Sequence, residues 1–280
     1  MTSTQLVLLG TGGGPTPKAS RSAPGQAVLV DGHTYLIDAG NGIARQLLLA
    51  GIEAKSLDTV LLTHHHSDHN ADLGTVLLLN WGANLDHPVD VLGPPPTTEM
   101  LRNFFEMQRV DIETRIADEG RPDLRELVTS RDITHAGLVL EDSRVRITAA
   151  LVNHPPFEVA LAYRIDTEDR AIVISGDTAP CQALIDLAEG ADILVHEVLY
   201  EPALDWIVSR SSGRNLRQHL VNSHTSVNDV GKIAEAAAVP TLVLSHFVPA
   251  DARIAEEVWT AAASAGFSGT VIAGRDLMVL

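Results

Sequence analysis

The chain has 280 residues, 45% of them hydrophobic, and its 36 acidic residues against 20 basic ones give a formal net charge of −16. This composition suffices for one large domain with a sizeable core. The negative charge repels polyanions, so nucleic acid is expected to be an unlikely partner. The single cysteine, Cys181, excludes an intrachain disulfide framework and any CxxC motif. Histidine and carboxylate side chains must therefore supply any metal ligands.

The beginning of the chain contains no charged segment followed by a long apolar run. No apolar run elsewhere approaches the length of a membrane span. We therefore expect a cytoplasmic protein that does not insert into membranes.

Short apolar runs rich in Val, Ile and Leu predict β-strands, and helix-like segments lie between them. Strands are expected at residues 6–9, 27–30, 35–37, 60–62, 145–152, 159–165, 171–174, 193–195 and 242–244. Helices are expected at residues 43–50, 71–79, 180–188, 227–238 and 252–263. This order predicts an α/β fold, and the absence of an obvious linker predicts a single domain over residues 1–280.

Residues 94–135 lack these strand signals and are expected to form a helical insertion. Leu101, Phe104 and Phe105 recur at a helical spacing among alternating charges, which predicts an amphipathic helix. Its apolar face is expected to pack on its own domain, to cover a substrate pocket as a lid, or to form a homodimer contact. The segment contains six Arg, no Lys and nine acidic residues, so it offers no basic arm for nucleic acid.

A dense group of residues that bind metals in other proteins follows the strand expected at 60–62. Residues 63–69 read Thr-His-His-His-Ser-Asp-His. A turn between a strand and a helix brings several imidazoles and a carboxylate into one small volume, and these groups suit zinc and related ions. The middle histidine of the three, His65, is expected to point away from the metals.

Three later residues, His154, Asp177 and His246, each follow an expected strand. In open α/β sheets, ligand sites gather beyond the carboxyl ends of the strands. Seven candidate ligands then meet, enough for two metal ions that share one carboxylate. They are His64, His66, Asp68, His69, His154, Asp177 and His246.

The pattern His-x-His-x-Asp-His at residues 64–69 resembles the signature of the metallo-β-lactamase superfamily. The resemblance covers nearly the whole chain, because it extends to the turn at 36–40, to His154, to the Ser-Gly-Asp-Thr sequence at 175–178 and to the Ser-His pair at 245–246. It implies a four-layer αββα sandwich with the metal site at one edge of the two sheets. It also implies that Asp38 is a buried carboxylate supporting the site.

The same resemblance implies two Zn²⁺ ions, with Mn²⁺ or Fe as other possible metals. One ion would be held by His64, His66 and His154. The other would be held by Asp68, His69 and His246. Asp177 would bridge the two.

Two more motifs are similar to those of the tRNase Z-like and arylsulfatase-like branch of this superfamily, namely His196-Glu197 and the Ser-His-Thr-Ser sequence at 223–226. They imply that Glu197 orients His224, which protonates the departing oxygen. Asp68, His224 and Glu197 are accordingly the candidate catalytic residues. On spacing alone His224 is instead a helix-cap residue. The glycine-rich turn at 10–15 lacks the Lys of a phosphate-binding loop and is interpreted as a tight turn near the site.

The leading hypothesis is a dinuclear zinc-dependent hydrolase of a small-molecule ester, either an aryl sulfate or a phosphodiester. A metal-bound hydroxide would attack, and His224 would act as the general acid. The alternatives are a lactone or carboxylic-ester hydrolase, a tRNA 3′-processing endonuclease, and a non-catalytic metal-binding protein. The remaining histidines are expected to be structural or exposed: His33, His87, His135, His196 and His219.

Overall fold

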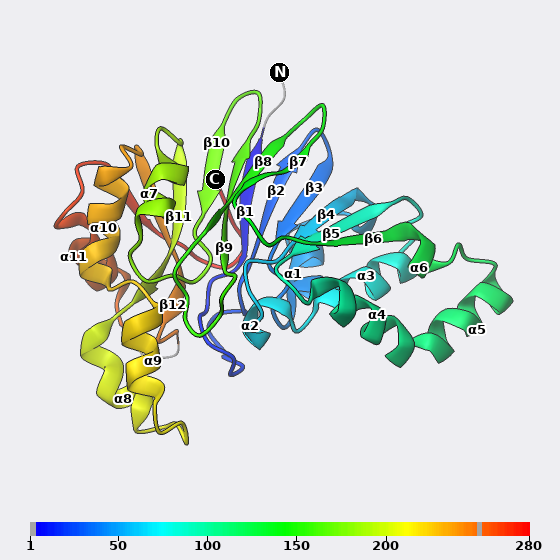
Figure 1. Ribbon diagram of the computed structural model, residues 1–280, viewed down its shortest axis with the longest axis horizontal. Coiled ribbons are helices and arrows are strands. Elements are labelled where there is room, and N and C mark those ends of the chain that lie inside the picture. Colours follow the sequence, from blue (N-terminus) through cyan, green and yellow to red (C-terminus); the bar gives the residue numbers. More distant parts are fainter. Residues whose placement is uncertain (1–3, 251–253) are drawn as a thin grey trace.

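Two β-sheets pack face to face at the centre of the molecule (Figure 1). The computed structural model describes residues 4–250 and 254–280, and within them each sheet has seven strands. The first sheet has the spatial order β14 (Met278–Val279), β1 (Gln5–Gly10), β2 (Gly25–Val30), β3 (His33–Ile37), β4 (Leu57–Leu61), β5 (Val89–Gly93) and β6 (Val128–Asp132). The second has the order β13 (Thr270–Ala273), β12 (Thr241–Val248), β11 (Ile193–Leu199), β10 (Ala171–Ile174), β9 (Leu161–Asp166), β8 (Arg146–Leu151) and β7 (Gly137–Glu141).

Each sheet contains four consecutive parallel strands. In the first sheet these are β3 to β6, and in the second they are β10 to β13. Parallel strands end at the same edge of a sheet, so the residues that follow them meet there. This shared edge is where the candidate ligands gather.

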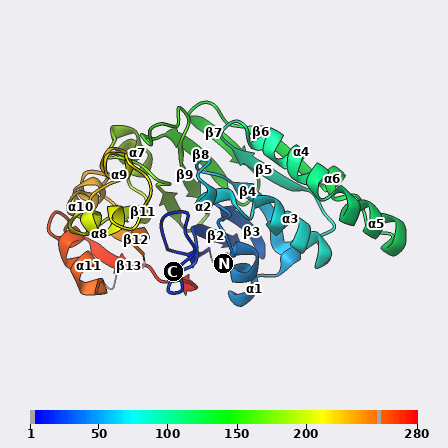
Figure 2. The same ribbon diagram turned by 90° about the horizontal axis from the view of Figure 1, so that it is seen from below.

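Helices cover the outer faces of the sheets (Figure 2). The first sheet is covered by α1 (Ile43–Leu49) and α3 (Leu73–Gly82), and the second by α7 (Gln182–Ala188), α10 (Val227–Ala236) and α11 (Glu256–Ser264). Leu6, Val28, Ile147 and Ile172 are fully buried between the two sheets. Separate apolar clusters join each sheet to its own helices. The predicted four-layer αββα sandwich is confirmed.

Several boundaries differ from those expected from the sequence. The strand expected at 193–195 continues to Leu199, and the one expected at 242–244 continues to Val248. The helix expected at 252–263 is observed as α11 from Glu256, and residues 252 and 253 lie outside the described ranges. Polar and charged residues interrupt the apolar runs of the two strands, so the runs are shorter than the strands themselves.

The segment expected to be a helical insertion consists of α4 (Thr97–Met107), α5 (Arg109–Glu119) and α6 (Leu124–Leu127). These helices are followed by β6, an edge strand that also lies within 94–135 and was not expected there. Ile112 and Leu124 pack on Trp81 of α3. Figures 1 and 2 both place α5 at the end of the molecule remote from α2 (Ser67–Asn70), which carries two candidate ligands, so α5 is not a lid over them. No helix in the described ranges is long and apolar enough to cross a membrane.

Candidate metal centre

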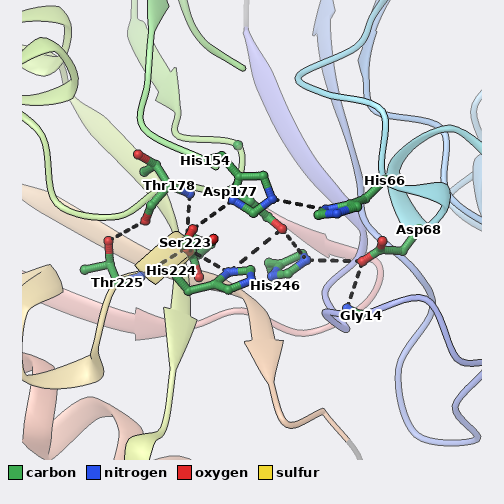
Figure 3. Close-up of polar contacts among 12 residues, drawn as sticks. Gly14, His66, Asp68, His154, Asp177, Thr178, Ser223, His224, Thr225 and His246 are labelled. Carbon is green, nitrogen blue, oxygen red and sulfur yellow. Dashed lines mark hydrogen bonds and ion pairs between the residues drawn. The ribbon is translucent and has the colours of Figure 1, made fainter. Parts of the chain in front are cut away.

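The seven candidate ligands come from both sheets and converge at the edge of the sandwich. Figure 3 labels five of them, namely His66, Asp68, His154, Asp177 and His246. The first sheet contributes the loop after β4, with His64 and His66, and α2, with Asp68 and His69. The second sheet contributes the three residues that follow β8, follow β10 and lie in β12. Their ligand atoms form two groups, each within 4.8 Å: His64, His66, His154 and Asp177, and then Asp68, His69 and His246.

In the first group, the hydrogen bonds of His64 and His154 place the ring proton on Nδ1 and leave Nε2 without a proton. His154 Nδ1 donates to Ser223 O at 2.8 Å, and His64 Nδ1 lies 3.0 Å from Thr63 Oγ1. Since the Thr63 hydroxyl donates to Asp38 at 2.9 Å, it accepts from His64. The Nε2 atoms of His64 and His154 are then bare, and both lie within 3.1 Å of His66 Nδ1. Three nitrogens this close, with at most one proton among them, fit a bound cation.

The second group has the same chemistry. His69 Nδ1 donates to Asp38 Oδ2 at 2.7 Å, which leaves Nε2 as the ligand atom. Among the described residues, His69 Nε2 and Asp177 Oδ1 are buried without a hydrogen bond, and His246 Nε2 lies 3.4 Å from Asp68 Oδ2. Buried polar atoms are almost always satisfied in folded proteins, so the two unbonded atoms also fit a bound cation.

Asp177 lies between the two groups. Its Oδ1 is 3.4 Å from His69 Nε2, and its Oδ2 is 3.2 Å from His246 Nε2 and 3.7 Å from His64 Nε2. Burial alone would raise the pKa of this carboxyl, but His246, His69 and His64 hold the pKa well below its usual range. The carboxylate is thus ionised and placed to contact ions in both groups.

The local backbone brings His246 into the site. Its neighbours Ser245 and Phe247 pair with the consecutive residues Glu197 and Val198 of β11, so His246 is the extra residue of a β-bulge, with φ of 43°. The sequence predicted His246 at the end of a strand, whereas it lies inside β12. A Cβ on Gly13 would come within 2.6 Å of the His246 ring, so only glycine permits this close packing.

His224 and Glu197 form a buried pair beside the candidate ligands. His224 Nδ1 donates to Glu197 Oε1 at 3.1 Å, and the backbone N–H groups of Thr178 and Thr225 donate to the same oxygen. Burial lowers the pKa of His224, but the Glu197 carboxylate outweighs burial and raises it to about 9. The bond at Nδ1 leaves Nε2 as the atom that can deliver a proton.

His224 does not cap the start of α10, the helix that follows it, so that interpretation is wrong. The N-cap of α10 is Ser226, whose hydroxyl accepts from Asn228 N. His224 instead has an extended backbone and occupies the C-cap position of the preceding helix, α9 (Leu216–Ser223).

Two aromatic residues of the site were missed by the sequence analysis. The ring of His219, on α9, lies 5.5 Å from His66, 5.9 Å from His154 and 5.9 Å from His224, measured between ring centroids. The Phe157 ring lies 4.7 Å from that of His66. His219 precedes Ser223 by one helical turn, and a single histidine on a polar helix gives no sequence signal of this placement.

Two open recesses flank the centre. One, of about 240 Å³, lies beside Asp68 and contains Lys18 and Arg21. The other, of about 470 Å³, lies beside α9 and contains His219 and Asn222.

Most of the other histidines are structural or exposed, as predicted. His65 contacts Pro94 O at 2.8 Å through its Nε2, away from the ligand groups. His33 and His87 contact Asp58. His135 lies at the surface beside Thr134, and His196 is buried in β11.

A family model described as a β-lactamase superfamily domain matches residues 33–247. The chain therefore belongs to the β-lactamase superfamily. Two solved structures share its fold over 99% of the chain and 98% of their own length, each with a TM-score of 0.72. They are the metallo-β-lactamase fold protein YhfI from Bacillus subtilis, at 20% identity, and the short form of human tRNase Z, at 18%.

Proteins of higher sequence identity indicate a more specific similarity within the superfamily. The chain is 36% identical over 276 residues to a protein of Mycobacterium avium named ribonuclease Z, covering 98% of this chain and 96% of the relative. A protein of the same name from Mycobacterium sp. strain KMS is 35% identical over 277 residues, covering 98% of this chain and 94% of the relative.

These relatives overturn one expectation from the sequence. Nucleic acid was predicted to be an unlikely partner, and that prediction is wrong, because the proteins similar over almost the entire chain are named ribonuclease Z. The error came from using the net charge of −16 as if it described the field at the site. Charge is distributed unevenly over a surface, so the net value does not determine what one edge of the molecule binds.

Proposed function

We propose that this protein is an endoribonuclease that hydrolyses a phosphodiester bond near the 3′ end of tRNA precursors. The supporting observation is the buried pair of His224 and Glu197 beside two groups of metal-ligand side chains. The 36% identity to a protein named ribonuclease Z supports RNA as the substrate class. An aryl sulfate has no comparable support, since none of the similar proteins described above carries a name that refers to it.

We also propose the ligand assignment and the metal. His64, His66 and His154 would hold one zinc ion. Asp68, His69 and His246 would hold the second, and Asp177 would bridge them. Imidazole and carboxylate ligands suit zinc, and a network in which the second ring nitrogen of each histidine is already bonded is typical of zinc sites. His154 and His69 show this pattern through Ser223 O and Asp38.

Bound divalent ions would activate water and stabilise the negative charge that develops on the phosphate. The side chains of this chain perform the other tasks. Glu197, itself held by two backbone N–H groups, fixes the ring of His224 and keeps a proton on Nδ1. His224 Nε2 delivers a proton to the departing oxygen, which would otherwise leave as a poor alkoxide leaving group.

The test is cleavage of a tRNA precursor by the zinc-loaded protein, with product ends mapped to the nucleotide. We expect one cut near the 3′ end, and loss of that cut in His224→Ala. Bis(4-nitrophenyl) phosphate serves as a control substrate, because its leaving group needs no proton. Turnover of the control without any site-specific cut in the precursor would refute the proposed substrate and retain only a phosphodiesterase.

A further inference from the structure

The recess beside α9 lies on the side of the centre where the leaving group must be. His224 is the candidate proton donor, so the departing oxygen lies next to it. The His219 ring lies 5.9 Å from the His224 ring, and His219 also lines the recess of about 470 Å³. The recess therefore offers space for the part of the substrate that carries the departing oxygen.

The side chains that line the recess suit an uncharged ligand. It is lined by prolines, amides, one imidazole and one hydroxyl, with no charged side chain among the described residues that line it: Pro155, Pro156, Asn215, Gln218, His219, Asn222 and Ser223. The recess beside Asp68 differs, because it contains Lys18 and Arg21. A nucleoside matches the recess beside α9, since its hydroxyls and base edges pair with amides.

The protonation of His219 follows from its neighbours. The Ser223 hydroxyl donates to Pro155 O at 2.7 Å, so it accepts from His219 Nδ1, which lies 3.4 Å away. His219 Nε2 then carries a lone pair, and no described residue forms a hydrogen bond with it. The half-buried ring thus presents one acceptor to the substrate.

A ribose carries vicinal 2′- and 3′-hydroxyls, and two imidazoles at the spacing of His219 and His224 can each contact one of them. From this geometry we infer that the recess beside α9 binds the nucleoside whose 3′-oxygen departs and that His219 Nε2 accepts a hydrogen bond from its 2′-hydroxyl. His219 is then a positioning residue that distinguishes RNA from DNA. This inference rests on the proposed RNA substrate.

The test measures binding, so it does not depend on cleavage. Two short labelled oligonucleotides are titrated with the zinc-loaded protein by fluorescence anisotropy. One is RNA ending in a 3′-hydroxyl, and the other has the same sequence with a 2′-deoxy terminal nucleotide. We expect the ribose probe to bind about threefold to tenfold more tightly, which is the contribution of one neutral hydrogen bond. In His219→Ala the two dissociation constants should become equal, and His219→Gln, which keeps an acceptor oxygen, should restore part of the difference.

Val221→Ala is the matched control, because Val221 is exposed on the same helix and does not line the recess. It should retain the full preference for ribose. Metal content is measured in every variant, since Ser223 O holds the ligand His154. Equal binding of both probes by the unchanged protein, or an equal loss for both probes in His219→Ala, would overturn the inference. A ribose preference that depends on His219 without any cut in the precursor would instead refute the endonuclease.

Discussion

His224 forms a hydrogen bond through Nδ1 with Glu197. Substitution of either residue can distinguish a catalytic role of this pair from a structural one. We expect His224→Ala to slow the turnover of phosphodiesters with alkoxide leaving groups by about 10²- to 10⁴-fold and to leave nitrophenyl esters nearly unchanged. Glu197→Gln should act in the same direction with a smaller effect, since it removes only the charge behind the ring.

The measurement is the slope of log kcat/KM against leaving-group pKa for the original protein and both variants. A proton donor predicts a steeper slope in each variant, because poor leaving groups suffer most. Parallel lines displaced by the same amount would show that the two residues support only the fold of the site.

At the level of single residues, the sequence predicted which candidate ligands come together but not the neighbouring residues that position them. All seven candidate ligands could be named because their types and spacing are unusual. His219 could not, since one histidine on a polar helix has no distinguishing pattern. Its position depends on how α9 packs against the His154 loop, through Ser223 and Pro155. Such a contact spans 68 residues of sequence and leaves no periodic signal.

At the level of elements, the turn after β1 illustrates how backbone shape positions a ligand. Gly13 packs directly against His246, and the Gly14 N–H donates to Asp68 Oδ2 at 2.8 Å. We expect Gly13→Ala to lower bound zinc from two ions per chain toward one, because its Cβ would displace His246 from the second group. The measurement is metal content by mass spectrometry after zinc loading and desalting.

Gly82→Ala is the matched control for this substitution. Gly82 is the last residue of α3, and a Cβ there would have no heavy atom within 4 Å. Alanine favours a helix over glycine, so this variant should keep both ions with unchanged or slightly raised stability. Two zinc ions retained in Gly13→Ala would show that the turn does not position His246.

The helices and strands were predictable where the hydrophobic pattern is strong, and less so where candidate site residues interrupt that pattern. β11 and β12 were both expected to be short, because His196, Glu197 and His246 interrupt their apolar runs. The polar strand β6 was missed for a related reason. It is an edge strand with largely exposed residues, so its sequence carries no apolar pattern.

At the level of the whole molecule, the candidate ligands join the two sheets. His64, His66, Asp68 and His69 follow a strand of the first sheet, and the other three belong to the second. Ions that bind only the folded state stabilise it by about 4 kcal/mol each at a thousandfold excess over Kd. We expect chelation to lower Tm by about 10 °C or more, as measured by calorimetry at fixed protein concentration.

Asp177→Ala provides the control for the chelation experiment. Its carboxylate contacts both groups, so the variant should lose both ions and already melt at the lower temperature. Chelator should then have no further effect on it. A variant that retains two ions, or that is still destabilised by chelator, would show that Asp177 does not bridge the groups.

Asp38 and His246 both have a left-handed backbone conformation that residues other than glycine rarely adopt, with φ of 60° and 43°. Each costs about 1–2 kcal/mol relative to a glycine at the same position. In protein kept free of metal ions, laboratory evolution toward heat resistance alone should therefore favour glycine at position 246, where the histidine ring would bind nothing. In the presence of metal ions the same selection should retain His246, because the ions that it helps to bind stabilise the fold by more than the backbone conformation costs. Which residue is the more stable at this one backbone position thus depends on whether metal ions are present.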